Sequence, residues 1–298
     1  MRTILVRRSP HSGPYTMVQW RFSVPGPARL LWGIILVALM LRLGFWIYTE
    51  RTWEDALITV RHAENAAAGR GLTHHPAQGP PIHGFTSPIS VLIPLLGEFV
   101  ARGSGLAVLR ISSLVATVIT LILAWRLAQH PRIALSPAAT TLFLGYLAME
   151  HHQILFGMAG METQWIVAIT LLGMWAGLEV IEYQPSTALA GTASPWRLGI
   201  GLGTVCGLAL WGRPDGVILI LAIAFAIGVW GRWGLVVPVI LGCVLCLAPW
   251  IAFRLGCSNG AQSSSAERTI CDCGCPPRSA GWGAGQSTSC GVPDHCKH

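Results

Sequence analysis

The chain has 298 residues, of which 52% are hydrophobic and 11% charged, and its mean hydropathy is +0.55. These values exclude an ordinary soluble domain and predict an integral membrane protein with an all-α, polytopic helical bundle. The net charge of +7 comes almost wholly from arginine. Because the arginines are scattered between apolar segments, they indicate orientation in a bilayer rather than binding to nucleic acid.

Apolar segments of the length that a bilayer requires predict about seven spans. The first apolar run is expected to remain as a signal anchor, since no small-residue cleavage site follows it. Ile89–Ala101 is shorter and is expected to be an interfacial or re-entrant helix. The predicted spans are Leu30–Tyr48, Leu106–Ala128, Ile133–Ala148, Trp165–Ile181, Leu198–Trp211, Val217–Trp230 and Leu235–Phe253.

Charge predicts the orientation of these spans. The arm at residues 1–29 is basic and is therefore expected to be cytoplasmic, in the plasma or inner membrane. If Ile89–Ala101 does not cross, Arg126, Arg132, Arg197 and Arg232 also fall on the cytoplasmic side. Residues 49–105 and 149–164 then form two external loops within a membrane domain at 30–255, and both loops carry acids.

The first external loop contains a charged segment, Glu54–Asn65, with five ionisable side chains in twelve residues. Its apolar residues recur at helical spacing, which predicts an amphipathic helix with its polar face toward external water and a stop at Gly69–Gly71. Thr52 and Asp55 have the spacing of a capping box, so Asp55 is equally consistent with helix capping and with catalysis. Glu64 is expected to be a solvated surface residue.

Four motifs, in order, resemble those of bacterial polyprenyl-phosphate-dependent glycosyltransferases of the C-type fold, and in particular terminal arabinofuranosyltransferase-like and mannosyltransferase-like proteins. They are the acidic segment Glu54–Asn65 with Gly69–Leu72, the segment His83–Pro88, Gly160–Thr163, and Arg213–Gly216. The resemblance covers about residues 29–253.

The resemblance implies transfer of a sugar from a polyprenyl-phosphate donor to a hydroxyl of a glycan, lipid or protein at the outer membrane face, a reaction of cell envelope biosynthesis. Asp55 would be the general base, because sugar hydroxyls are weak nucleophiles, and Glu54 would support it. Displacement without a covalent intermediate would invert the anomeric centre. Mg²⁺ or Mn²⁺ shared by Asp55 and Glu162 is one possible source of positive charge at the leaving phosphate; the alternative for Glu162 is an acid at a helix start.

Substrate-binding candidates each have a structural alternative. Arg61 and Arg213 could contact phosphate, or could form ion pairs with a nearby glutamate and with Asp215. Thr86 and Ser87 could contact substrate or begin a helix. The loop histidines His62, His74, His75 and His83 lack the spacing of a zinc site, and they are expected to be ordinary loop residues.

Residues 256–298 are polar, rich in glycine and serine, and contain six of the nine cysteines. They predict a disordered tail, an out-of-frame continuation of a longer gene, or a small metal or disulfide module. An inactive, truncated remnant or non-catalytic membrane protein is therefore an alternative function. A transporter is the third candidate, less favoured because Arg42, Arg110 and Glu179 fall toward span ends while the acids lie in external loops.

Overall fold

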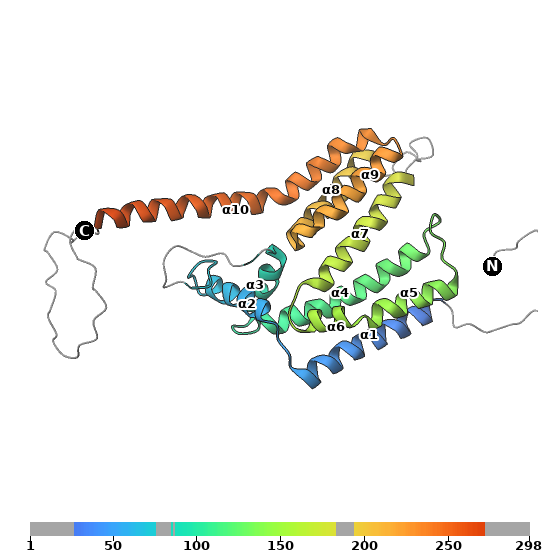
Figure 1. The fold of residues 1–298 in the computed structure, drawn as a ribbon, viewed down its shortest axis with the longest axis horizontal. Helices are drawn as coiled ribbons and strands as arrows, with labels where there is room; N and C mark the ends of the chain where they lie inside the picture. The colour runs from blue at the N-terminus through green and yellow to red at the C-terminus, as the bar shows by residue number, and fades with distance from the viewer. Residues whose placement is uncertain (1–26, 76–84, 86, 183–193, 272–298) are drawn as a thin grey trace, which may run out of the picture. The chain divides into compact units, whose positions relative to one another are not determined.

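The computed structural model describes residues 27–75, 85, 87–182 and 194–271, with residues 254–271 as backbone alone. Regular structure within these residues is entirely helical (Figure 1). The helices are α1 (Pro27–Thr49), α2 (Glu54–Ala67), α3 (Pro88–Val100), α4 (Gly105–Ala128), α5 (Pro137–Met149), α6 (His151–Met158), α7 (Thr163–Glu182), α8 (Pro195–Gly212), η1 (Pro214–Gly216), α9 (Val217–Val229), η2 (Trp233–Leu235) and α10 (Val236–Cys271).

Four helical segments are long and apolar enough to cross a bilayer, namely Ala28–Thr49, Gly105–Ala128, Thr163–Glu182 and Trp233–Phe253. Large apolar side chains such as Leu36, Met40 and Phe225 are exposed on the helices, as expected where lipid rather than water surrounds them. The chain therefore has the features of a membrane protein. The predicted count of about seven spans is not confirmed.

Some of the predicted spans form helices that are too short to cross a bilayer, and for Ile133–Ala148 the cause is local. Ile133–Ala148 was expected to be one helix, but Ala134 has φ 43°, and α5 begins only at Pro137, where Ser136 caps it by accepting from the N–H of Ala139. At 13 residues, α5 is about 20 Å long, which is less than the hydrocarbon core. α9 is equally short, and α3, which was expected not to span, has the same length.

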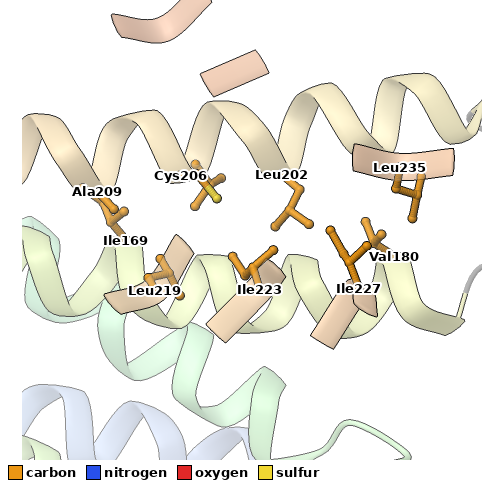
Figure 2. Packing of buried hydrophobic residues seen from close by; sticks show 10 residues of the cluster. Ile169, Val180, Leu202, Cys206, Ala209, Leu219, Ile223, Ile227 and Leu235 are labelled. Atoms are coloured by element: carbon orange, nitrogen blue, oxygen red, sulfur yellow. The ribbon is translucent and has the colours of Figure 1, made fainter. Parts of the chain in front are cut away.

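α7 packs between two apolar clusters. One cluster joins α7 to α8, α9 and η2 through residues such as Ile169, Leu202 and Ile223 (Figure 2). The other joins α1, α4, α5 and α7 through residues such as Leu31, Leu121 and Leu144. The short helices α2 and α3 pack on each other and on α4, which places them at one end of this bundle (Figure 1).

Glycines bring α8 close to the start of α10. A Cβ on Gly199 would lie 2.7 Å from Cγ of Pro238, and one on Gly207 would lie 2.6 Å from Cβ of Cys246. A Cβ on Gly203, between them, would collide with the carbonyl of Val239. Small residues at four-residue spacing let membrane helices approach in this way.

Gly203→Ala is therefore expected to destabilise the protein by about 1–3 kcal/mol, the usual cost of overpacking. Thermal unfolding of the purified protein in detergent measures this. Gly201→Ala is the matched control, because nothing lies within 4 Å of its Cβ position on the same helix. Equal unfolding temperatures for the two variants would contradict the close packing.

Beyond Ala252 the chain forms a second compact unit. The backbone of α10 continues as helix through Cys271, so residues 256–271 are helical where a disordered tail was one of the alternatives from position 256. Residues 272–298, which carry the rest of that prediction, lie outside the described residues, as do residues 1–26 of the basic arm.

Candidate functional site

A cavity of about 230 Å³ lies where the four predicted motifs meet at the start of α3. Four sequence-predicted residues line it from separate segments, and they are Asp55, Ser87, Glu162 and Arg213. The other lining residues are Ile58, Thr59, Phe85, Ser90, Gly160 and Met161. The lining thus combines two carboxylates, three hydroxyl side chains and a guanidinium.

Asp55 is placed by the way α2 begins. The helix starts at Glu54, and extended Trp53 precedes it without any side-chain cap. The predicted capping box is therefore wrong: Thr52 does not cap the helix, and its Oγ1 accepts a hydrogen bond from Nη2 of Arg110 at 2.8 Å. Asp55 lies in the first turn of α2 with its side chain exposed at the cavity.

The two acidic loops, which precede α2 and α7, are joined directly beside Asp55. The backbone N–H of Trp53 donates to the carbonyl of Ala159 at 2.9 Å, and the Trp53 ring packs edge-on against Phe156. Gly160 has φ +97°, and a Cβ there would lie 2.9 Å from Cβ of Ala56. Only glycine allows this close approach of the second loop to α2.

Arg110 of α4 fixes both loops at once. Its guanidinium, in a side chain only 7% exposed, donates to the carbonyl of Met158 at 2.8 Å and to the carbonyl of Arg51 at 2.9 Å, besides the hydroxyl of Thr52. Met158 precedes Glu162, and Arg51 precedes Asp55. One buried side chain therefore sets the position of both acidic segments. The motif analysis did not find this role, although a charge inside an apolar span could have indicated it.

Glu162 is buried and stands directly before α7. Its carbonyl accepts from the N–H of Trp165 at 2.9 Å, so it belongs to the helix start as well as to the cavity. Burial raises the pKa of its carboxyl; nearby Arg213 opposes this change and the charge of Asp55 adds to it. The three charged groups of the cavity are thus coupled.

The structural alternatives offered for Ser87 and Arg213, a helix start and an ion pair, are both found in the structure beside the cavity. Ser87 caps α3 by accepting from the N–H of Ser90 at 3.3 Å, and its Oγ donates to the carbonyl of Trp211 at 3.3 Å. Arg213 pairs with Asp215 at 3.5 Å, but both side chains are well exposed, so this pair is weak. Thr86 lies outside the described residues.

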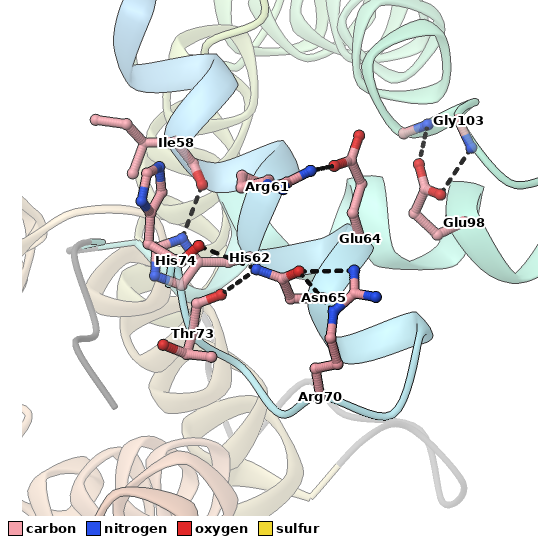
Figure 3. A network of polar contacts seen from close by, with 11 residues as sticks. Ile58, Arg61, His62, Glu64, Asn65, Arg70, Thr73, His74, Glu98 and Gly103 are labelled. Carbon is pink, nitrogen blue, oxygen red and sulfur yellow. Dashed lines mark hydrogen bonds and ion pairs between the residues drawn. The ribbon is translucent and has the colours of Figure 1, made fainter. Parts of the chain in front are cut away.

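Two predicted site residues do not line the cavity. Glu54 is exposed on the first turn of α2, and Arg61 forms an exposed ion pair with Glu64 at 3.0 Å (Figure 3). The ion-pair alternative for Arg61 therefore describes the structure, and Glu64 is a partner rather than an isolated surface charge. The assignments of Glu54 to catalysis and Arg61 to phosphate contact lose their geometric basis.

The apolar stripe of α2 is buried as predicted, but part of its polar face, which was expected to face water, is turned inward as well. Thr59, His62 and Asn65 are buried, whereas Leu57 is 52% exposed. His62 Nδ1 lies 2.7 Å from the carbonyl of Ile58, and Asn65 binds the carbonyl of Thr73 and the guanidinium of Arg70 (Figure 3). These bonds fold the segment after α2 back against the helix.

The helix stop and the histidines also follow from this geometry. Gly69 has φ +74°, and the N–H of Arg70 reaches the carbonyl of Asn65 at 2.9 Å, as in a Schellman C-cap. His62 is a fully buried helix residue rather than a loop histidine, while His83 lies outside the described residues. Among the described residues, one group of three possible metal ligands occurs, Glu150–His151–His152, and it is on the surface.

A divalent cation fits the cavity only in part. Asp55 and Glu162 supply two carboxylates, and Mg²⁺ commonly uses one or two carboxylates together with substrate phosphate and water. Arg213 brings positive charge to the same place, and its guanidinium could bind a phosphate group without a metal.

Comparison with protein-family models, curated proteins and solved structures found no match. The resemblance carried by the four motifs therefore stays a prediction, and the geometry of the cavity is the independent observation.

The raised pKa of Glu162 predicts a pH-dependent stability. Below the ordinary carboxyl pKa the group is neutral whether the chain is folded or unfolded, so it costs nothing. As pH rises toward the folded pKa, the unfolded chain ionises more readily, and stability is lost. Glu162→Gln should remove this loss, so its unfolding temperature should exceed that of the wild type increasingly from about pH 4 upward.

Thermal unfolding in detergent across this pH range tests the expectation, with Glu54→Gln, an exposed acid outside the cavity, as the control. Parallel pH profiles for wild type and Glu162→Gln would show that burial does not penalise the Glu162 carboxylate.

Proposed function

We propose that this protein is a membrane glycosyltransferase that moves a sugar from a polyprenyl-phosphate donor to an acceptor hydroxyl. The observation that carries the proposal is the cavity shared by Asp55, Ser87, Glu162 and Arg213. The motifs that resemble the family lie far apart in sequence, and a random likeness gives no reason for their polar residues to line one cavity. A cavity of about 230 Å³ is below the usual 300–1,000 Å³ of ligand sites, which suits one sugar unit.

Asp55 acts as the general base. Its carboxylate takes the proton from the acceptor hydroxyl as the oxygen attacks the anomeric carbon, and the bond from that carbon to the phosphate oxygen breaks. Polyprenyl phosphate leaves with the electron pair, and the anomeric centre inverts. Asp55 suits this role because it begins a helix and is accessible from the cavity.

Arg213 faces the charge of the leaving group. Its pairing with Asp215 is long and exposed, so an incoming phosphate can replace that partner at little cost. A phosphate also gains charge-assisted hydrogen bonds from a guanidinium. A bound Mg²⁺ or Mn²⁺, held by Asp55 and Glu162, would supply further neutralisation of the phosphate.

Glu162 sets the electrostatics between these groups. When it is protonated, the Glu162 carboxyl can donate a hydrogen bond to a sugar hydroxyl and leaves Asp55 as the basic group. When it is ionised, it repels Asp55 and attracts Arg213 or a cation. The protein is proposed to lie in the plasma or inner membrane with its N-terminus cytoplasmic and the cavity on the outer face, where the two acidic loops are expected.

Sugar transfer in reconstituted vesicles tests the function. Purified protein is supplied with radiolabelled polyprenyl-phosphate mannose or arabinofuranose and with a crude envelope acceptor, and labelled product is separated from donor. Transfer that depends on the protein supports the proposal. Donor binding without transfer would favour the alternative, a non-catalytic remnant, and absence of both binding and transfer would remove the proposal.

A further inference from the structure

The end of the bundle opposite the acidic cavity has a second set of charged residues. α7 begins directly after Glu162 at the cavity and ends at Glu182 at this end, about 30 Å for its 20 residues. Arg132 follows α4 here, and Arg232 follows α9. These groups take no part in the proposed transfer reaction.

An apolar groove of about 250 Å³ lies between α7, α8 and α9 near this end. Side chains such as Leu178, Leu202 and Ile227 line it, and Gly173 and Gly177 of α7 lie along it. The Cβ position of Gly177 is 4.0 Å from Cγ1 of Ile223, so a large side chain there would occupy the groove. Because its lining is apolar, the groove favours a hydrocarbon chain over water.

The groove adjoins a polar cavity of about 500 Å³. Ile181, Trp230 and Arg232 line both spaces, and Arg132 and Glu182 line the polar one. A ligand can therefore place an apolar chain in the groove and a polar group among these charges without leaving the surface of the protein.

The polar cavity has an excess of positive charge. Arg132 donates to Glu182 at 2.9 Å, and His130 lies 3.7 Å from the same carboxylate. Arg232 donates one N–H to the carbonyl of Ile181 at 2.9 Å. No described acid forms an ion pair with Arg232, and a guanidinium has five N–H donors, so it retains donors for an anion.

We propose that this groove and the cavity at its mouth bind one anionic glycerophospholipid of the adjacent leaflet, with an acyl chain between α7 and α9 and the phosphate at Arg232 and Arg132. Basic pockets between membrane helices bind anionic headgroups in this way. The arginines at the mouth favour this occupant over a partner helix, which would leave Arg232 without an anion. The groove favours it over a free phosphate, which has no apolar part.

Lipid retention measured by native mass spectrometry of the full chain tests the proposal. The probes are dioleoylphosphatidylglycerol and dioleoylphosphatidylcholine, which share acyl chains but differ in net charge. Wild type should retain the anionic lipid in preference, and Arg232→Gln should lower that retention about fivefold, the effect of one arginine near an anionic headgroup. Arg197→Gln is the control, because Arg197 is an exposed arginine at the N-terminal end of α8 that lines neither space.

Two further variants distinguish binding of the lipid's acyl chain from binding of its headgroup. Gly177→Leu should reduce retention of both lipids, whereas Gly201→Leu, on the open face of α8, should not. Glu182→Gln removes the competing carboxylate and should raise retention of the anionic lipid even if Gly177→Leu fails to fold. Equal retention of the two lipids by wild type, or no change in Arg232→Gln and Glu182→Gln, would overturn the proposal.

Discussion

Asp55→Asn is expected to lower the turnover number for sugar transfer by about 10²–10⁴-fold, the usual contribution of a positioned general base. Asparagine keeps the size of the side chain but cannot accept the proton of the acceptor hydroxyl. Donor affinity should change little, because phosphate contact is assigned to Arg213. Because Asp55 is exposed and caps no helix through its side chain, the unfolding temperature should also stay near that of the wild type.

Glu64→Gln is the matched control, since Glu64 lies on the same helix, and among the described residues its carboxylate pairs with exposed Arg61. Glu54→Gln separates the two adjacent acids: a loss under about tenfold is expected, because Glu54 does not line the cavity. Normal turnover in Asp55→Asn would end the assignment of Asp55 as base, and a large loss in Glu54→Gln alone would transfer that role to Glu54.

Arg110→Met is expected to impair both folding and transfer. Methionine leaves the carbonyls of Met158 and Arg51 and the Thr52 hydroxyl without their donor, and each unsatisfied buried group costs about 1–3 kcal/mol. A total loss of about 2–5 kcal/mol follows, because part of this region is open to solvent. Where the protein folds, turnover should fall by about 10²-fold, the effect of a displacement near 1 Å in a reacting group.

Thermal unfolding and transfer assays on the same preparations separate the two effects. Arg126→Met is the control, because Arg126 is an exposed residue of the same helix whose guanidinium lies over Trp125. Arg110→Lys keeps the charge but lacks the planar fork, so it should be intermediate. Arg110→Met with the stability and turnover of the Arg126 variant would show that Arg110 does not position the loops.

The sequence predicted the local features whose causes are local. The helix at 54–67 follows from the spacing of Ala56, Val60 and Ala63, and its end follows from Gly69, whose positive φ an L-residue adopts only at a cost. Three long apolar helices, α1, α4 and α7, were predicted to within a few residues, because hydrophobic length is a property of the segment itself.

The sequence did not predict that part of the polar face of α2 is buried along with its apolar stripe. Thr59, His62 and Asn65 were expected to face water, but Phe85 and the segment through Thr73 cover them. A polar side chain can be buried when neighbouring backbone groups satisfy its hydrogen bonds, and these partners come from other parts of the chain. The same limit applies to Thr52, whose hydroxyl binds Arg110 rather than capping the helix.

The amino-acid sequence by itself determined that the chain is helical and apolar, and that its acids occur in short motifs between apolar segments. Only the tertiary structure decided which of those acids share a cavity. Asp55 and Glu162 are brought together because Arg110 bonds to both loops and Gly160 allows their contact, whereas Glu54, on the same turn as Asp55, does not line the cavity. Such proximity depends on packing between helices distant in sequence, which no local pattern specifies.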